Sequence, residues 1–199
     1  MTVNFKKPDI ETHRTFVNYK DRTVTNYIVV HCSATQNKPS YSWKTIDQMH
    51  RQQGWLGIGY HFVIKTDGTI ETGRPLSAVG SHVKGHNNDS VGICLIGGVD
   101  SKGKSVDNFT EEQKNSLRTL IDYLRGVYKD EVLVLGHRDF EGVRKDCPCF
   151  DVKEWYGRGA EFAIYTDDEA FKKKLKLSNV DFLDYNGDSI EEGDLVRVK

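Results

Sequence analysis

The stretch LGHRDFEGVRKDCPCFD (residues 135–151) gathers one histidine, one lysine and two cysteines within seventeen positions. Imidazole and thiolate groups are good ligands for Zn²⁺, and a cysteine beside a histidine can also form a nucleophile with its general base. Two nearby cysteines can alternatively belong to a disulfide framework. These residue types therefore indicate a metal site, a cysteine hydrolase or a disulfide, and the choice depends on the rest of the chain.

Two histidines occupy similar places, each at the carboxyl end of a predicted strand. His31 lies at the end of NYIVVHC (26–32), a short β-branched and aromatic run, and His137 directly follows EVLVLG. Functional groups collect at this edge of α/β sheets. If the strands are neighbours, both imidazoles face one point, and Cys147, ten residues after His137, adds a thiolate. Two imidazoles and a thiolate leave a fourth position for water, as catalytic zinc requires.

The other cysteines and most other histidines have simpler interpretations. Cys32 and Cys94 lie within apolar strands, where free cysteine packs as a small hydrophobic residue. The N-terminal sequence has no apolar segment typical of a secretion signal, so we expect the chain to stay in a cytoplasm, where reducing conditions disfavour disulfides. Four histidines have no partner that the sequence identifies and are predicted to lie outside the site: His13, His50, His61 and His86.

Composition places the 199-residue chain among ordinary globular proteins, with 37% hydrophobic and 29% charged residues. This length gives one medium domain with room for a small second one. The formal net charge of −1 creates no overall field that would attract nucleic acid or an anionic membrane. No run approaches the roughly 18 apolar residues of a membrane span. We therefore expect a chain that binds no nucleic acid and does not insert into membranes. We also expect it to be a monomer.

The predicted elements between His31 and His137 build one sheet. SWKTIDQMHRQQGW is a helix with Ser42 as its N-cap, and YHFVIKTDGTIETGR is a hairpin around Asp67-Gly68. SVGICLIGG is another buried strand, which ends at a pair of glycines.

The clearest helix lies in FTEEQKNSLRTLIDYLRGVY, where Thr110 and Gln113 form a capping box. Its apolar stripe consists of Leu117, Leu120, Ile121, Leu124 and Tyr128. The order strand, helix, hairpin, strand, helix, strand predicts an α/β domain with a mixed central β-sheet flanked by helices.

Six blocks of the sequence together resemble one known family. They are VVHCSAT, HRQQGWLGIGYHFVIKTDGTIETGR, AVGSHVKGHNNDSVGICLIGG, FTEEQ with its helix, GHRD, and KDCPCFDVKEWY. In these blocks the chain is similar to zinc-dependent N-acetylmuramoyl-L-alanine amidases of the phage-lysozyme type, which are related to the animal peptidoglycan recognition proteins. The resemblance covers residues 27–156 and is far more specific than a short motif.

The resemblance implies that His31, His137 and Cys147 bind one Zn²⁺, with Cys147 matching the family's cysteine before proline. One departure concerns the loop between the last two residues. The family usually places this cysteine eight residues after the GHRD histidine, whereas here the spacing is ten. The eighth position is Lys145, a poor zinc ligand, so we place a two-residue insertion within FEGVR. Cys149 is then a spare thiol.

The resemblance also implies three residues that act on water or substrate. Tyr60 of GYHF would be catalytic and would orient or deprotonate the water, because the glutamate base of HExxH enzymes is missing. Lys145, two residues before the ligand cysteine, would be catalytic by stabilising the developing oxyanion. His82 of GSH would face the substrate groove and bind substrate.

We divide the chain into a polar N-terminal arm (1–25), a zinc amidase domain (26–157) and a small module (160–199). The module carries six Lys/Arg and ten Asp/Glu, a formal charge of −4, which leaves +3 for residues 1–159. Its predicted strand, helix, helix, strand pattern resembles a LysM module, although the usual GDTL opening is absent. The resemblance implies binding to glycans that contain N-acetylglucosamine. The alternative is a docking appendage without sugar affinity.

The family resemblance implies a phage endolysin that hydrolyses the amide between N-acetylmuramic acid and L-alanine in bacterial peptidoglycan and so lyses the cell. It would wait in the host cytoplasm until a holin opens the inner membrane. Three alternatives remain: a non-catalytic peptidoglycan-binding module, an amidase that also regulates a phage RNA polymerase, and a cysteine hydrolase built on His137 with Cys147 or Cys149. Binding modules of this kind commonly lack the ligand cysteine that is present here, and a cysteine hydrolase leaves His31 unexplained.

Overall fold

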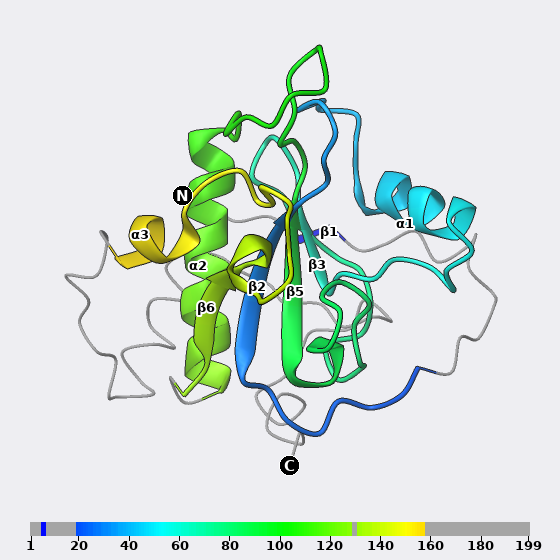
Figure 1. Ribbon diagram of the computed structural model, residues 1–199, viewed down its shortest axis with the longest axis vertical. Helices are drawn as coiled ribbons and strands as arrows, with labels where there is room; N and C mark the ends of the chain where they lie inside the picture. The colour runs from blue at the N-terminus through cyan, green and yellow to red at the C-terminus, as the bar shows by residue number, and fades with distance from the viewer. Residues whose placement is uncertain (1–4, 7–18, 129–130, 158–199) are drawn as a thin grey trace.

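A six-stranded mixed sheet with helices on both faces forms the centre of the computed structural model (Figure 1). The structure describes residues 5–6, 19–128 and 131–157. The predicted LysM-like module, the GRG boundary beyond Gly157 and most of the N-terminal arm lie outside these residues. No helix in the described part of the chain is long and apolar enough to span a membrane.

The strands are arranged in the order β1-β4-β3-β5-β2-β6. Their bounds are β1 Phe5–Lys6, β2 Tyr27–Cys32, β3 Phe62–Ile64, β4 Ile70–Thr72, β5 Ser90–Leu95 and β6 Leu133–Gly136. β3 and β4 are the predicted antiparallel hairpin, and the other neighbouring pairs in this sheet are parallel. The register pairs Val30 of β2 with Gly136 of β6, so His31 and His137 leave adjacent strands at the same edge.

The predicted helices form where their capping residues place them. They are α1 (Trp43–Gln52) and α2 (Glu111–Val127). The structure adds a helix that the sequence did not predict, α3 (Val152–Gly157), and the short 3₁₀ turns η2 (Asn87–Asp89) and η3 (His137–Asp139). Ser42 is the N-cap of α1. In α2 the Thr110 side chain accepts a hydrogen bond from the Gln113 amide, and the Gln113 side chain accepts one from the Thr110 amide, as the capping box predicts.

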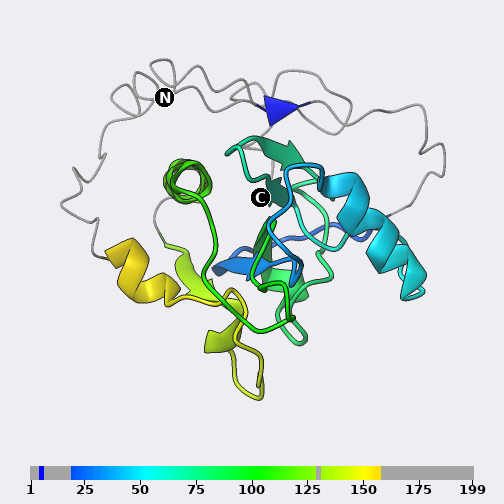
Figure 2. The same cartoon turned by 90° about the horizontal axis from the view of Figure 1, so that it is seen from above.

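α2 covers one face of the sheet, and α1 lies on the other side (Figure 2). Leu117, Leu120, Ile121 and Leu124 of α2 are fully buried in the main core, whereas Tyr128 packs at its border. The buried side-chain amide group of Gln113 also donates to the carbonyls of Ile64 and Ile96, which ties the start of α2 to the ends of β3 and β5. The predicted α/β architecture is therefore confirmed.

The alternation of side chains along β2 decides which face carries the site. Ile28 and Val30 pack with α2 in the main core, whereas Val29 packs with Val83 and Phe140 on the opposite face. Successive residues of a strand point to opposite faces, so His31 shares the face of Val29. His31 is thus buried on the side of the sheet that α2 does not cover.

The last residues of the segment predicted as an arm join this packed domain. The Val79 amide donates to the Lys20 carbonyl at 2.7 Å, and the Arg22 amide donates to the Ser77 carbonyl at 2.6 Å. The Arg22 side chain is only 2% exposed and donates to the Leu76 carbonyl and to the Tyr128 hydroxyl. Sequence reasoning missed this buried arginine, because Leu76 and Tyr128 are far away in the chain.

Candidate metal centre and active site

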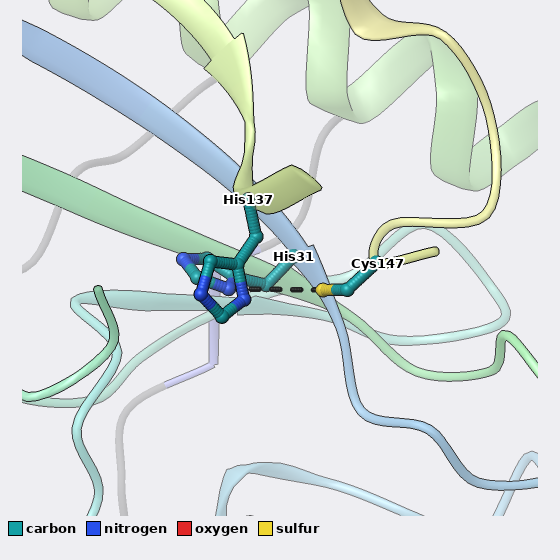
Figure 3. Close-up of side chains that lie close together, drawn as sticks. All are labelled: His31, His137 and Cys147. Carbon is teal, nitrogen blue, oxygen red and sulfur yellow. Dashed lines mark hydrogen bonds between the residues drawn. The ribbon is translucent and has the colours of Figure 1, made fainter. Parts of the chain in front are cut away.

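His31, His137 and Cys147 meet at the carboxyl edge of the sheet (Figure 3). One ligand atom from each residue lies within 4.8 Å of the other two. The Cys147 Sγ is 3.8 Å from Nδ1 of His31, and the two imidazole centroids are 4.6 Å apart. Bond lengths in a tetrahedral zinc site put such ligand atoms about 3.3–3.6 Å apart. Small side-chain movements therefore suffice for these three residues to hold one Zn²⁺.

Both imidazoles are kept in the neutral form that a metal ligand requires. Burial, and then the charges of His82 and His137, lower the pKa of His31 well below its ordinary value. Burial lowers the pKa of His137, and the Lys145 charge lowers it further. At neutral pH each ring therefore keeps a lone pair available for a metal ion.

The loop between His137 and Cys147, in which we expect a two-residue insertion relative to the family, turns outward into solvent. The Val143 amide donates to the Phe140 carbonyl at 3.2 Å, and Gly142, with φ +77°, lies exposed in this turn. The Arg138 amide then donates to the Cys147 carbonyl at 2.8 Å, which closes the loop beside η3. Glu141 and Gly142 are exposed to solvent, and Cys147 returns to the neighbourhood of His137.

Cys149 points away from the three-residue cluster. Its Sγ donates to the Gly98 carbonyl at 3.1 Å and lies 3.7 Å from the Sγ of Cys32. All four cysteines are free thiols, and Cys32 and Cys94 are buried as predicted. The disposition agrees with the interpretation of Cys149 as a spare thiol beside the site.

Tyr60 lies next to His31. Its ring centroid is 5.0 Å from that of His31 and 5.3 Å from that of His50. Burial, and then Cys94 and Cys147, raise the pKa of Tyr60 well above its ordinary value. The phenol therefore stays protonated at neutral pH and acts as a hydrogen-bond donor.

Lys145 is exposed on the same loop as Cys147. Its positive charge contributes to the lowered pKa of both His31 and His137.

His82 contacts His31 directly. Its Nδ1 lies 3.0 Å from Nε2 of His31, and the two rings meet edge to face with centroids 5.0 Å apart. Burial, and then the His137 charge, lower the pKa of His82 to about 3. The sequence predicted that His82 faces the substrate groove, but it did not predict this contact with His31.

Two histidines that the sequence did not single out support the segment around Tyr60. The Gly59 amide donates to Nδ1 of the buried His50 at 3.0 Å. His61, which is 1% exposed, accepts from the Gly92 amide at Nδ1 and is 3.0 Å from the Ala78 carbonyl at Nε2. Their partners are backbone groups of distant segments, so residue type and spacing contain no signal for these contacts.

The structure thus brings the buried His31 and the half-buried His137 and Cys147 together at one edge of a mixed sheet, with Tyr60 beside His31. Known proteins are similar to this chain in sequence and in fold. A family model for N-acetylmuramoyl-L-alanine amidase matches residues 20–150. The endolysin of Escherichia phage T7 is 49% identical over 140 residues, which cover 70% of this chain and 91% of that protein.

Solved structures agree with the sequence comparison. The endolysin amidase LysCS from Clostridium intestinale has a TM-score of 0.59 and 31% identity, over 79% of this chain and 96% of that one. Drosophila PGRP-LB, solved in complex with tracheal cytotoxin, has a TM-score of 0.56 and 25% identity, over 75% of this chain and 88% of that one.

Fold, site and comparisons together define a peptidoglycan-amidase type of hydrolase on a scaffold shared with the peptidoglycan recognition proteins. The chain belongs to the N-acetylmuramoyl-L-alanine amidase family, as the six sequence blocks predict.

Proposed function

We propose that this amidase is a phage-type endolysin that hydrolyses the amide bond between N-acetylmuramic acid and L-alanine in bacterial peptidoglycan and thereby lyses the cell. The observation that carries the proposal is the convergence of His31, His137 and Cys147 at the open edge of the sheet. The similarity to the phage T7 endolysin over 91% of its length supports the endolysin assignment. Family membership identifies the scissile bond.

His31, His137 and Cys147 are the residues that would hold one Zn²⁺. Two neutral imidazoles and a thiol form a donor set that zinc prefers over the harder Mg²⁺ and Ca²⁺. When bound, zinc supplies Lewis acidity that polarises the amide carbonyl and lowers the pKa of water.

Tyr60 is proposed to position the attacking water or the reacting carbonyl. Its raised pKa means that the phenol donates a hydrogen bond rather than acting as a phenolate base. The 5.0 Å separation of its ring centroid from that of His31 places it beside the centre. A donor fixed in a partly buried site needs little reorganisation during the reaction.

Lys145 is proposed to stabilise the charge that develops on the substrate. Water adds to the carbonyl carbon, the C–N bond breaks, and the released L-alanine amine takes up a proton. Negative charge accumulates on the carbonyl oxygen in between, and the Lys145 ammonium offsets it. Its electrostatic influence on both histidine ligands supports this placement.

The remaining parts of the proposal concern the oligomeric state, the location of the enzyme and the role of its C-terminal residues. The enzyme acts as a monomer, stays in the host cytoplasm, and reaches the wall after a holin opens the inner membrane. Residues 160–199 add affinity for glycan that contains N-acetylglucosamine. A pull-down with sacculi would compare the binding of the full chain with that of a 1–157 truncation.

The decisive experiment uses the full chain and purified sacculi. We expect release of muramic-linked amino groups, loss of this activity with EDTA, and its return with stoichiometric Zn²⁺. Full activity of a metal-free preparation would contradict the zinc mechanism, and zinc binding without amide cleavage would leave a binding module. A cysteine hydrolase would instead be inactivated by thiol alkylation even when zinc is bound.

A further inference from the structure

His31 has both ring nitrogens engaged. Its Nδ1 faces the Cys147 Sγ at 3.8 Å, and its Nε2 lies 3.0 Å from Nδ1 of His82. We propose that His82 is a positioning residue that fixes the tautomer and the ring orientation of His31, so that Nδ1 is the atom left for the metal. The inference rests on the proposed function only in taking His31 as a ligand.

The direction of the hydrogen bond between the two histidines follows from Ser90. This serine is fully buried, and its hydroxyl donates to the His86 carbonyl, which can only accept. The single hydroxyl hydrogen is then used, and the Ser90 Oγ can only accept from His82 Nε2, 3.4 Å away.

A neutral imidazole has one donor and one acceptor nitrogen. His82 with its hydrogen on Nε2 must therefore accept at Nδ1, and His31 must donate from Nε2. The chain of hydrogen bonds runs from His31 through His82 and Ser90 to the His86 carbonyl. It leaves the lone pair of His31 on Nδ1, which is the nitrogen that faces Cys147.

The His82 ring is also held by the shape of its surroundings. A Cβ at Gly80 would come within 2.5 Å of the ring, and a Cβ at Gly92 within 2.7 Å. The Asn87 side chain accepts from the amides of His82 and Val83 at 2.7 and 2.9 Å, which holds the backbone of this segment. The ring occupies space that two glycines leave open, so its position does not depend on the hydrogen bonds alone.

The hydrogen-bond partner of His31 differs in chemical type from the usual partner of a metal-binding histidine. Such histidines commonly donate their second N–H to a carboxylate, a carbonyl or water, and loss of that partner typically costs about 10- to 100-fold in metal affinity. Here the partner is another imidazole. It orients His31 without adding negative charge next to the centre.

Nitrogen-15 NMR of the full chain, prepared without metal, tests the relay directly. Long-range proton–nitrogen correlations report which ring nitrogen carries the hydrogen. We expect both His31 and His82 to be protonated at Nε2. A His31 ring protonated at Nδ1 would overturn the inference, whatever the enzymatic activity is.

Zinc affinity of the variants provides the second measurement, by competition with a chromophoric chelator. His82→Ala should raise the zinc Kd by about 10- to 100-fold. His82→Asn, whose amide oxygen can accept from His31, should recover most of this loss. His86→Asn is the matched control, because it removes a histidine from the same loop and keeps the carbonyl that accepts from Ser90.

Unchanged zinc affinity in His82→Ala would contradict the positioning role. If this variant does not fold, Ser90→Ala replaces it, and we expect a mixture of His31 tautomers in its metal-free NMR spectrum. A single, unchanged tautomer in Ser90→Ala would also count against the relay. Normal zinc binding without amide cleavage would refute the proposed function and leave the relay intact, so the two failures are distinguishable.

Discussion

The Sγ of Cys147 lies 3.8 Å from Nδ1 of His31, although 116 positions separate the two residues. β2 carries His31 to the edge of the sheet, and the parallel pairing of β2 with β6 brings His137 to the same edge. The hydrogen bond from the Arg138 amide to the Cys147 carbonyl then returns the loop to this point. The centre therefore depends on strand pairing and on one loop closure.

The two neighbouring cysteines should respond differently to substitution. Cys147→Ser removes a thiolate ligand, so we expect loss of stoichiometric zinc and of amidase activity. Cys149→Ser should keep both, because the Cys149 Sγ points to the Gly98 carbonyl. Metal analysis and sacculus hydrolysis measure the two outcomes. Zinc loss in Cys149→Ser with retention in Cys147→Ser would mean that the loop places the other cysteine at the metal.

Tyr60→Phe should lower kcat and leave zinc content unchanged. The substitution removes one hydroxyl donor beside His31, and loss of such a donor typically costs about 10²- to 10³-fold in kcat. Zinc stoichiometry and the unfolding midpoint serve as controls for an intact centre. A Tyr60→Phe enzyme with wild-type kcat would show that the phenol has no part in the reaction.

Lys145→Met should reduce kcat more than it changes KM, because the ammonium is proposed to act on charge that develops during the reaction. We expect a loss on the order of 10²-fold, as for other donors to an oxyanion. Arg144→Met is the matched control, since it removes a positive charge from the adjacent exposed position. Equal losses in both variants would indicate a general electrostatic effect rather than a specific role for Lys145.

Acidification should destabilise the fold through His61. Burial, and then His82 and Arg22, hold the pKa of His61 well below its ordinary value, whereas a histidine in the unfolded chain has a pKa of about 6.5. Below about pH 6.5 the unfolded chain therefore binds a proton that the folded protein does not. The free energy of unfolding therefore decreases as the pH is lowered below this value, by up to about 1.4 kcal/mol per pH unit for this residue.

The structural reason is that the Gly92 amide already donates to Nδ1 of His61, so a second ring proton would face a donor. Denaturant unfolding of the metal-free protein between pH 5.5 and 8 measures the slope. His61→Asn should be less stable at pH 8 and should lose less stability on acidification. Parallel curves for the variant and the wild type would assign the acid sensitivity to other groups.

Local signals in the sequence predicted most of the fold. The capping box of Thr110 and Gln113 marks the start of α2, and the Asp67-Gly68 turn marks the hairpin of β3 and β4. These signals act between residues close in the chain, so they are readable without the tertiary structure. The positions of His31 and His137 at strand ends likewise indicated the edge at which a site would form.

The buried polar contacts were not predictable in this way. Arg22 donates to the Leu76 carbonyl, His61 pairs with the Gly92 amide, and neither partner has a recognisable side-chain signature. Backbone groups are the same at every position, so a sequence does not mark which of them will face a given side chain. Only the packed fold identifies these partners.

The sequence by itself determined the residue types of the centre, the elements that carry them and the family to which they belong. The tertiary structure decided how they meet: the predicted ligand Cys147 faces Nδ1 of His31, and the His82 ring lies against the other nitrogen of the same histidine. The His82 ring occupies the space left at Gly80 and Gly92, and the loop that leads to Cys147 turns at Gly142. Such contacts arise from packing between segments that are distant in the chain.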